Sequence, residues 1–191
     1  MKLIFATQNK NKAAEIQKLM PEGIEILTLQ DIDCQDDIPE TAPTLEGNAQ
    51  LKARWISEKY KVNCFADDTG LEVFALNGAP GVISARFAGE QRSDSDNMQK
   101  LLADLSEQSD RSAQFRTAIC LILDGEEFLF EGIVTGRIRE DKQGENGFGY
   151  DPIFEPEGLN RTFAQMNMEE KNQLSHRARA FAKMIAFLAT K

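Results

Sequence analysis

Two long strand-like segments meet at a two-residue turn, and this feature constrains the fold more than any other. The segments are QFRTAICLIL (114–123) and EEFLFEGIVTGRI (126–138), and the dipeptide Asp124-Gly125 joins them. Asp-Gly is a strong hairpin signal because both residues tolerate the positive φ angles of a two-residue turn. The sequence therefore predicts a long β-hairpin.

Strand-like and helix-like segments alternate along the rest of the chain. KLIFAT (2–7) is apolar throughout, as in a central strand covered on both faces, and IEILTL (24–29) is a second candidate strand. Helices are expected over Asn9–Met20, Leu45–Tyr60 with Thr44 as N-cap, Asn97–Leu105, and from about Ser175. This order predicts an α/β fold with a mixed central β-sheet and flanking helices. We expect residues 1–191 to form a single domain of two lobes with a cleft between them.

Composition excludes several classes of protein. The net charge of −9 argues against binding to a nucleic acid polymer, which needs a basic surface. The three cysteines are odd in number and form no CxxC motif, which favours buried free thiols in a reducing compartment. The N-terminal MKLIFATQNK has only a short apolar core, so we expect no signal peptide, and no run is long enough to span a membrane. We therefore expect a cytoplasmic protein without a membrane partner.

Two adjacent acids interrupt an apolar stretch. VNCFADDTGLEVFAL (62–76) places Asp67 and Asp68 before Thr69-Gly70, which predicts a strand, a tight turn and a second strand. The acids are either ordinary turn residues or a metal or phosphate site at the carboxyl end of a strand. Glu40, in the acidic loop 31–43, matters only if the fold brings it near Asp68, because two carboxylates commonly hold Mg²⁺ against phosphates.

The first strand ends in the polar segment Thr7-Gln8-Asn9-Lys10-Asn11-Lys12. A strand, a polar turn and a helix start can aim backbone N–H groups and the positive helix end at an anion. The segment is not a Walker loop, which requires GxxxxGK[ST]. It is either a phosphate site or a solvated helix start.

NGFGYDPIF (146–154) combines glycines, aromatic residues and an acid. Phe148 could stack on a base and Asp151 could accept from base N–H groups. The other interpretation is a structured turn with Phe148 and Tyr150 in the core.

SHRAR (175–179) holds the single histidine of the chain. With Ser175 as N-cap, His176 and Arg177 lie in the first helical turn, where cations oppose the helix dipole. Such a misfit is expected of residues that serve a ligand, although a lone histidine is more often structural.

Six motifs in order give the chain its resemblance to the inosine triphosphate pyrophosphatase family, also called Ham1-like. They are T-x-N-x-x-K-x-x-E from Thr7, PET-x-x-T-x-x-x-N-A-x-x-K-A from Pro39, ADDTGL from Ala66, GAPGVISAR from Gly78, GFGYDPIF from Gly147 and EEK-x-x-x-SHR from Glu169. One departure is Gln8, where the family usually has glycine. Arg86 and the GAPG loop are assigned no chemistry.

The resemblance implies Mg²⁺-dependent hydrolysis of ITP, dITP or XTP to the monophosphate and pyrophosphate. It also implies a homodimer with the active-site cleft between the two lobes of each chain. Three alternatives are a Maf-type pyrophosphatase of other base preference, a non-hydrolysing nucleotide sensor, and a phosphatase that releases orthophosphate. The GFGYD and SHR motifs argue against the first alternative, and intact Asp68 and Glu40 argue against the second.

The resemblance also implies a role for each site residue. Asp68 is expected to be the general base and, with Glu40, a metal contact; Asp67 orients Asp68 or shares the metal. The expected phosphate contacts are Thr7, Gln8, Asn9, Lys10, Asn11, Lys12, Lys52, Thr69 and Lys171. The expected base contacts are Phe148, Gly149, Tyr150, Asp151, His176 and Arg177.

Overall fold

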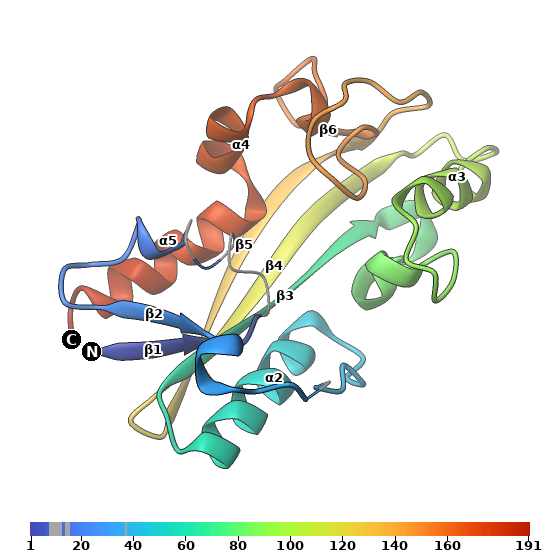
Figure 1. Ribbon diagram of the computed structural model, residues 1–191. Coiled ribbons are helices and arrows are strands. Elements are labelled where there is room, and N and C mark those ends of the chain that lie inside the picture. Colours follow the sequence, from blue (N-terminus) through green and yellow to red (C-terminus); the bar gives the residue numbers. More distant parts are fainter. Residues whose placement is uncertain (8–12, 14–15, 37) are drawn as a thin grey trace. The chain divides into compact units, whose positions relative to one another are not determined.

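The computed structural model describes residues 1–7, 13, 16–36 and 38–191 (Figure 1). The helices of the described residues are α2 (Leu45–Tyr60), α3 (Asp94–Asp104), α4 (Met168–Leu174) and α5 (His176–Leu188), with 3-10 turns η1 (Gln30–Ile32), η2 (Phe74–Leu76), η3 (Gly81–Arg86) and η4 (Phe163–Gln165). Half of the helix predicted over residues 9–20 lies outside this description; among its other residues, Ala13, Ile16 and Gln17 are helical.

Six strands form one mixed sheet in the order β2-β1-β3-β4-β5-β6 (Figure 1). They are β1 (Lys2–Phe5), β2 (Glu25–Thr28), β3 (Cys64–Val73), β4 (Ser112–Leu123), β5 (Glu126–Ile138) and β6 (Phe154–Pro156). β1 pairs in parallel with β2 and with β3, whereas β6 pairs antiparallel with β5. Asp124 and Gly125 join β4 to β5 with positive φ angles of 52° and 87°, so the predicted hairpin and the mixed α/β sheet are confirmed.

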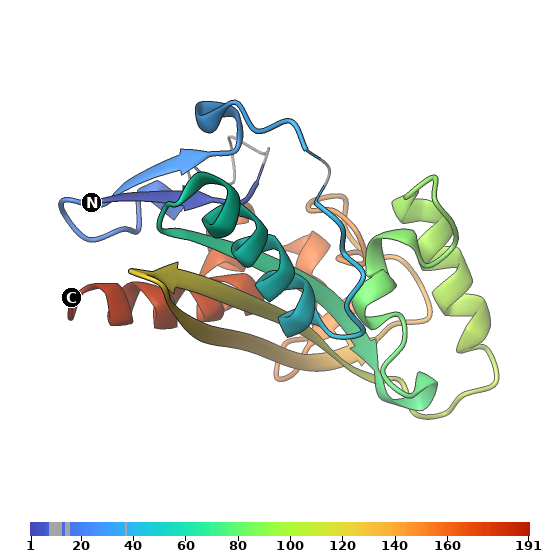
Figure 2. The ribbon, with the colours of Figure 1, turned by 90° about the horizontal axis from the view of Figure 1, so that it is seen from below.

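The chain divides into two compact units. The first consists of 1–68, 118–131 and 180–191, and the second of 69–117 and 132–179. In the first unit, α2 and the C-terminal part of α5 cover opposite faces of the sheet (Figure 2). Ala49, Ala53 and Ile56 of α2 pack on one face, and Phe181 and Met184 of α5 pack on the other.

The second unit has its own apolar core. Leu71 and Val73 of β3 pack there with Leu101 of α3, and the aromatic rings of Phe154 and Phe163 join them. Each unit therefore buries a separate set of side chains, and β3, β4 and β5 contribute residues to both.

The predicted turn at Asp67–Gly70 is wrong. β3 runs without interruption from Cys64 to Val73, through both acids. Phe65 and Ala66 before the acids and Leu71 after them are fully buried, and their packing overrides the turn preference of Asp and Gly. The two acids therefore lie inside a strand.

Two further elements are not among those predicted. Phe154–Pro156 forms the short strand β6. A separate helix, α4, precedes α5, and Asn167 caps it: its side chain accepts from Glu170 N–H while the Glu170 carboxylate accepts from Asn167 N–H. The α5 start agrees with the prediction, because Ser175 Oγ accepts from Ala178 N–H at 3.1 Å.

Candidate active site

Asp67 and Asp68 are neighbours on β3, so their side chains point to opposite faces of the sheet. Cys64 and Ala66 pack in the cluster that contains α2 residues, so Asp68, on the same side of the strand, faces α2. Phe65 packs in the cluster on the opposite face, which is the side of Asp67. Because the strand is continuous, the two acids lie on opposite faces of the sheet, and of the two only Asp68 faces α2.

Helix α2 presents two side chains to Asp68 from consecutive turns. Asn48 Nδ2 donates to Asp68 Oδ2 at 3.2 Å, and Lys52 Nζ contacts Asp68 Oδ1 at 3.3 Å. The residues are four apart, so they share one face of the helix. Thr44 fixes the start of this helix, since its side chain accepts from Gly47 N–H at 3.0 Å.

The acidic loop joins the same cluster. Lys52 Nζ also contacts Glu40 Oε1 at 2.6 Å, and Asn48 Oδ1 accepts from Ala42 N–H at 2.9 Å. Glu40 and Asp68, which are 28 positions apart in sequence, therefore share one ammonium group. The condition set by the sequence, that the fold bring Glu40 near Asp68, is met.

The charged groups of this cluster shift one another's pKa values. Burial raises the pKa of the Asp68 carboxyl; Lys52 opposes the rise and Glu40 adds to it. Burial alone would lower the pKa of Lys52, but Asp68 and Glu40 outweigh this effect, so the pKa of Lys52 is raised. Lys52 thus stays charged, and Asp68 is a stronger base than a solvated aspartate.

The expected base contacts lie in the second unit, and four of them, Phe148–Asp151, lie on a loop with two left-handed glycines. Gly147 has a φ of 79°, and a Cβ there would lie 2.1 Å from Asp151 Oδ2, so only glycine fits. Phe148 is 60% exposed, the largest exposed fraction among the big hydrophobic side chains of the described residues. Its ring is thus available to a ligand.

Two carboxylates hold consecutive N–H groups of this loop. Asp151 Oδ2 accepts from Phe148 N–H at 2.9 Å, and Asp94 Oδ2, in the first turn of α3, accepts from Gly149 N–H at 2.7 Å. Tyr150 is buried, and its hydroxyl donates to Ser84 O at 2.8 Å. The exposed ring of Phe148 therefore stands on an anchored backbone.

Lys171 belongs to the same group of contacts. Its Nζ pairs with Asp151, which is 2% exposed, and lies 4.6 Å from the centroid of the Phe148 ring. Within its own unit Lys171 lies among the expected base contacts, and its contact with phosphate stays a prediction.

His176 is 4% exposed and packs in the aromatic core of the second unit. Its ring stacks on Phe115 with centroids 4.7 Å apart and an interplanar angle of 14°. Arg177 follows it in the first turn of α5 and is partly exposed. This packing fixes the orientation of His176 and of the helix start that carries Arg177.

The remaining expected phosphate contacts are placed only in part. Gln8, Asn9, Lys10, Asn11 and Lys12 lie outside the described residues. Thr7 follows β1, and its carbonyl accepts from Leu29 N–H at 3.2 Å. Thr69 Oγ1 lies 2.7 Å from Thr117 Oγ1 on β4.

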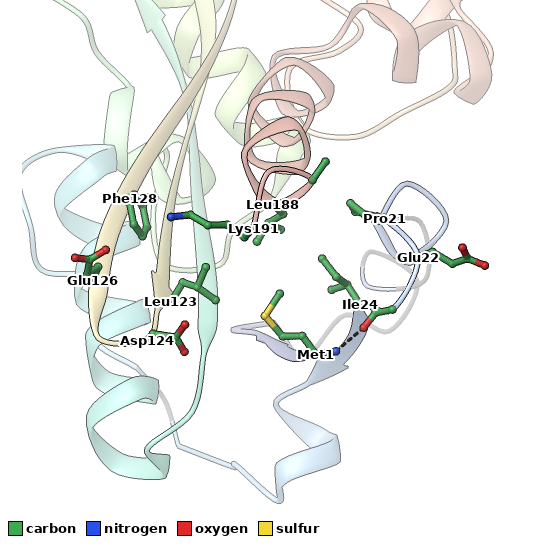
Figure 3. Close-up of a pocket in the computed structure, with 12 residues that line it drawn as sticks. Met1, Pro21, Glu22, Ile24, Leu123, Asp124, Glu126, Phe128, Leu188 and Lys191 are labelled. Atoms are coloured by element: carbon green, nitrogen blue, oxygen red, sulfur yellow. Dashed lines mark hydrogen bonds between the residues drawn. The ribbon is translucent and has the colours of Figure 1, made fainter.

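A pocket of about 500 Å³ lies in the first unit (Figure 3). Its walls include Ile24, Leu123, Phe128 and Leu188, and Met1 closes one side through a hydrogen bond from its amino group to Gly23 O. None of the expected site residues that the structure describes lines it.

The residues suit a hard divalent cation that substrate phosphates help to hold. Within the described part of the chain, no group of three or more His, Cys, Asp or Glu side chains is arranged to hold a metal. Mg²⁺, however, is usually bound by one or two carboxylates together with substrate phosphates. The oxygens of Glu40 and Asp68 that converge on Lys52 Nζ already hold one cation, so the donor set fits.

Fold and site together define an α/β protein with a paired-carboxylate centre on one unit and an anchored aromatic loop on the other. The model of the Ham1 family matches residues 3–187, and the chain belongs to that family.

Curated relatives and solved structures agree with this assignment. The chain is 58% identical over 187 residues to a dITP/XTP pyrophosphatase of Flavobacterium psychrophilum, covering 98% of each chain. It is 58% identical to the protein of the same name from Flavobacterium johnsoniae, covering 100% of each. The structure of the Staphylococcus aureus Ham1 protein matches with a TM-score of 0.95 and 41% identity, over 100% of this chain and 99% of the other. A HAM1 protein from Coxiella burnetii matches with a TM-score of 0.96 and 36% identity, over 100% of both chains.

Sequence reasoning missed two residues that the structure connects to the site. Asn48 appeared only as a motif position, although its spacing of four from Lys52 could have placed it on the same helix face. Asp94 could not be found, because nothing in the sequence links the start of α3 to Gly149.

No helix in the described residues is long and apolar enough to cross a membrane.

Proposed function

We propose that this protein hydrolyses the deaminated purine nucleoside triphosphates ITP, dITP and XTP to the monophosphate and pyrophosphate, with Mg²⁺. The observation that carries the proposal is the convergence of Glu40 and Asp68 on Lys52. The names of the close relatives support the choice of substrate. Removal of these nucleotides from the cellular pool is the proposed role, and a cytoplasmic homodimer is the proposed form.

In this proposal, Asp68 is the general base. Its carboxylate takes a proton from the water that attacks the α-phosphorus, and its raised pKa favours this transfer at neutral pH. Mg²⁺, when bound by Glu40 and Asp68, would neutralise the charge that develops on the phosphate oxygens. Asn48 orients Asp68 by donating to Oδ2. Lys52, with Thr7–Lys12, Thr69 and Lys171, is proposed to contact the phosphates.

The proposed base contacts are Phe148, Gly149, Tyr150, Asp151, His176 and Arg177. Phe148 stacks on the purine, and its exposed ring supports this role. Arg177 donates to the oxygen at C6, which adenine replaces with an amine. A donor that the bound base covers and leaves unpaired costs roughly 1–3 kcal/mol, which corresponds to about ten- to a hundredfold discrimination against ATP.

The test offers ITP, XTP, ATP, GTP and UTP separately to the purified protein with Mg²⁺, and assays pyrophosphate and orthophosphate in parallel. We expect pyrophosphate from ITP and XTP and little from ATP or UTP. Asp68→Asn is the control for the catalytic site: general-base loss lowers rates by about 10²–10⁴-fold, while ITP binding stays measurable. Orthophosphate as the product, or equal rates on all five nucleotides, would overturn the proposal.

A further inference from the structure

Lys52 contacts the two carboxylates in a way that a phosphate contact alone does not require. Its Nζ lies 2.6 Å from Glu40 Oε1 and 3.3 Å from Asp68 Oδ1, and its side chain is largely buried. The neighbouring lysine on the same helix, Lys59, pairs with a single exposed carboxylate, Asp36. Lys52 is therefore the cation that holds Glu40 and Asp68 together.

The same oxygens are the ones proposed to hold the divalent metal. A Mg²⁺ ion lies about 2.0–2.1 Å from its oxygen ligands, so an ion bound to Glu40 Oε1 and Asp68 Oδ1 would stand close to the Lys52 ammonium. The Mg²⁺ ion and the Lys52 ammonium, so close together in a partly buried site, would repel each other strongly. Lys52 and the metal cannot both keep these contacts.

We infer that Lys52 is a tethered cation that competes with the divalent metal for Glu40 and Asp68, and that the incoming metal displaces its ammonium group from both. This inference rests on the proposed function, because it takes Glu40 and Asp68 as the metal contacts. The displaced ammonium is then free to contact the phosphates. Before the metal arrives, the Lys52 ammonium keeps the two carboxylates in the geometry of a cation site.

Helix α2 makes the exchange possible without unfolding. Asn48 holds Asp68 Oδ2 and the Ala42 N–H independently of Lys52, so the acidic loop and Asp68 keep one anchor when the ammonium leaves. Lysine has a long flexible stem, so Nζ can move while its backbone stays in the helix.

The test measures metal binding without nucleotide. Mn²⁺ affinity is determined by electron paramagnetic resonance of the free ion for the wild type, Lys52→Met and Lys59→Met. We expect Lys52→Met to bind Mn²⁺ about tenfold tighter or more, because the competing charge is gone, and Lys59→Met to bind as the wild type does. Equal or weaker affinity in Lys52→Met would overturn the inference.

Thermal unfolding gives a second readout. In EDTA, Lys52→Met should unfold at a lower temperature than the wild type, because Glu40 and Asp68 then repel each other without a cation between them. Saturating Mn²⁺ should restore its stability, and the metal-induced shift should exceed that of the wild type. A shift no larger than that of the wild type would contradict displacement. Lys52→Gln repeats both measurements if Lys52→Met does not fold.

Glu40→Gln separates failure of this inference from failure of the proposed site. If Glu40→Gln binds Mn²⁺ as tightly as the wild type, the metal does not use Glu40, and both the proposed metal contacts and the inference fall. If Glu40→Gln loses affinity while Lys52→Met stays at the wild-type value, the metal site stands and only the tethered cation is wrong.

Discussion

At the residue scale, the catalytic proposal depends on how Asp68 is held. Its two carboxylate oxygens have different partners: the amide of Asn48 and the ammonium of Lys52. Asn48 also fixes the acidic loop, because its Oδ1 accepts from Ala42 N–H. Asn48 is thus a positioning residue for both Asp68 and the segment that carries Glu40.

We predict that Asn48→Ala lowers both stability and turnover. Asn48 is 1% exposed, so the change leaves buried polar partners unsatisfied and costs about 1–3 kcal/mol of unfolding free energy. Turnover of ITP should fall well beyond this stability loss, because Asp68 loses its orientation. Urea unfolding and kcat of the folded protein measure the two effects.

Asn97 provides the matched control for Asn48. It is also a buried asparagine on a helix, and its Oδ1 accepts from a loop N–H, that of Ala88, at 2.7 Å. Its amide donates to Ala85 O instead of to an acid. Asn97→Ala should lose similar stability with a much smaller loss of kcat. Equal losses of kcat in both variants would remove Asn48 from the site.

Arg177 is proposed to discriminate between bases through the oxygen at C6. Arg177→Ala should reduce kcat/KM for ITP more than for ATP, and the ratio of the two should fall by about ten- to a hundredfold. Arg179→Ala is the control, since Arg179 lies on the same helix and donates to Ile133 O at 2.8 Å. Parallel losses on ITP and ATP in Arg177→Ala would exclude it from base recognition.

At the element scale, the loop that carries Phe148 is held from two helices. Asp151 is tied to Lys171 of α4, and Asp94 of α3 accepts from Gly149 N–H. The positive end of α3 stabilises the Asp94 carboxylate. The orientation of the aromatic ring therefore depends on α3 although α3 carries none of the expected site residues.

We predict that Asp94→Ala weakens binding of the base without weakening binding of the phosphates. The inhibition constant of IMP should rise several-fold while that of pyrophosphate stays constant, because only the loop at Phe148 is loosened. Asp96→Ala removes a second carboxylate from the same helical turn, one that contacts Gln91 and not the loop, and should change neither constant. A matching rise for pyrophosphate in Asp94→Ala would contradict this account.

The elements also differ in how well the sequence predicts them. Local signals fix α2, whose bounds Leu45–Tyr60 and cap Thr44 agree with the prediction, and the hairpin at Asp124-Gly125. β3 could not be predicted as one strand, because burial on both sides of the acids overrides their local turn preference. α4 has a local signal in the sequence, the capping box formed by Asn167 and Glu170.

The site residues also divide into those that local sequence indicates and those that only packing between elements brings together. The family resemblance points to Glu40, Lys52 and Asp68, yet the contact of both carboxylates with the Lys52 ammonium forms only when the loop, helix and strand are packed. The opposite orientations of Asp67 and Asp68 follow from strand geometry once the turn is rejected. Contacts between elements far apart in sequence, such as Asp94 with Gly149, leave no local trace.

At the scale of the whole molecule, the cores of both units enclose titratable groups. Cys64 and Cys120 are fully buried, and burial raises the pKa of each thiol to about 12. Burial also raises the pKa of Tyr150 in the second unit. All three cysteines are free and buried, as predicted.

We predict that the two buried thiols, Cys64 and Cys120, make the protein less stable in alkaline solution. The unfolded thiols release their protons near pH 8.5, whereas Cys64 and Cys120 keep theirs to about pH 12 in the folded protein. Above the unfolded pKa the folded state binds more protons, so the free energy of unfolding falls as pH rises, by at most about 1.4 kcal/mol per pH unit for each thiol. Urea unfolding between pH 8 and pH 10.5 under reducing conditions measures the slope. The double variant Cys64→Ala, Cys120→Ala should flatten this slope between pH 8.5 and pH 10, before tyrosine and lysine titrate. A wild-type free energy of unfolding that stays constant over that interval would show that the folded protein accepts the thiolates.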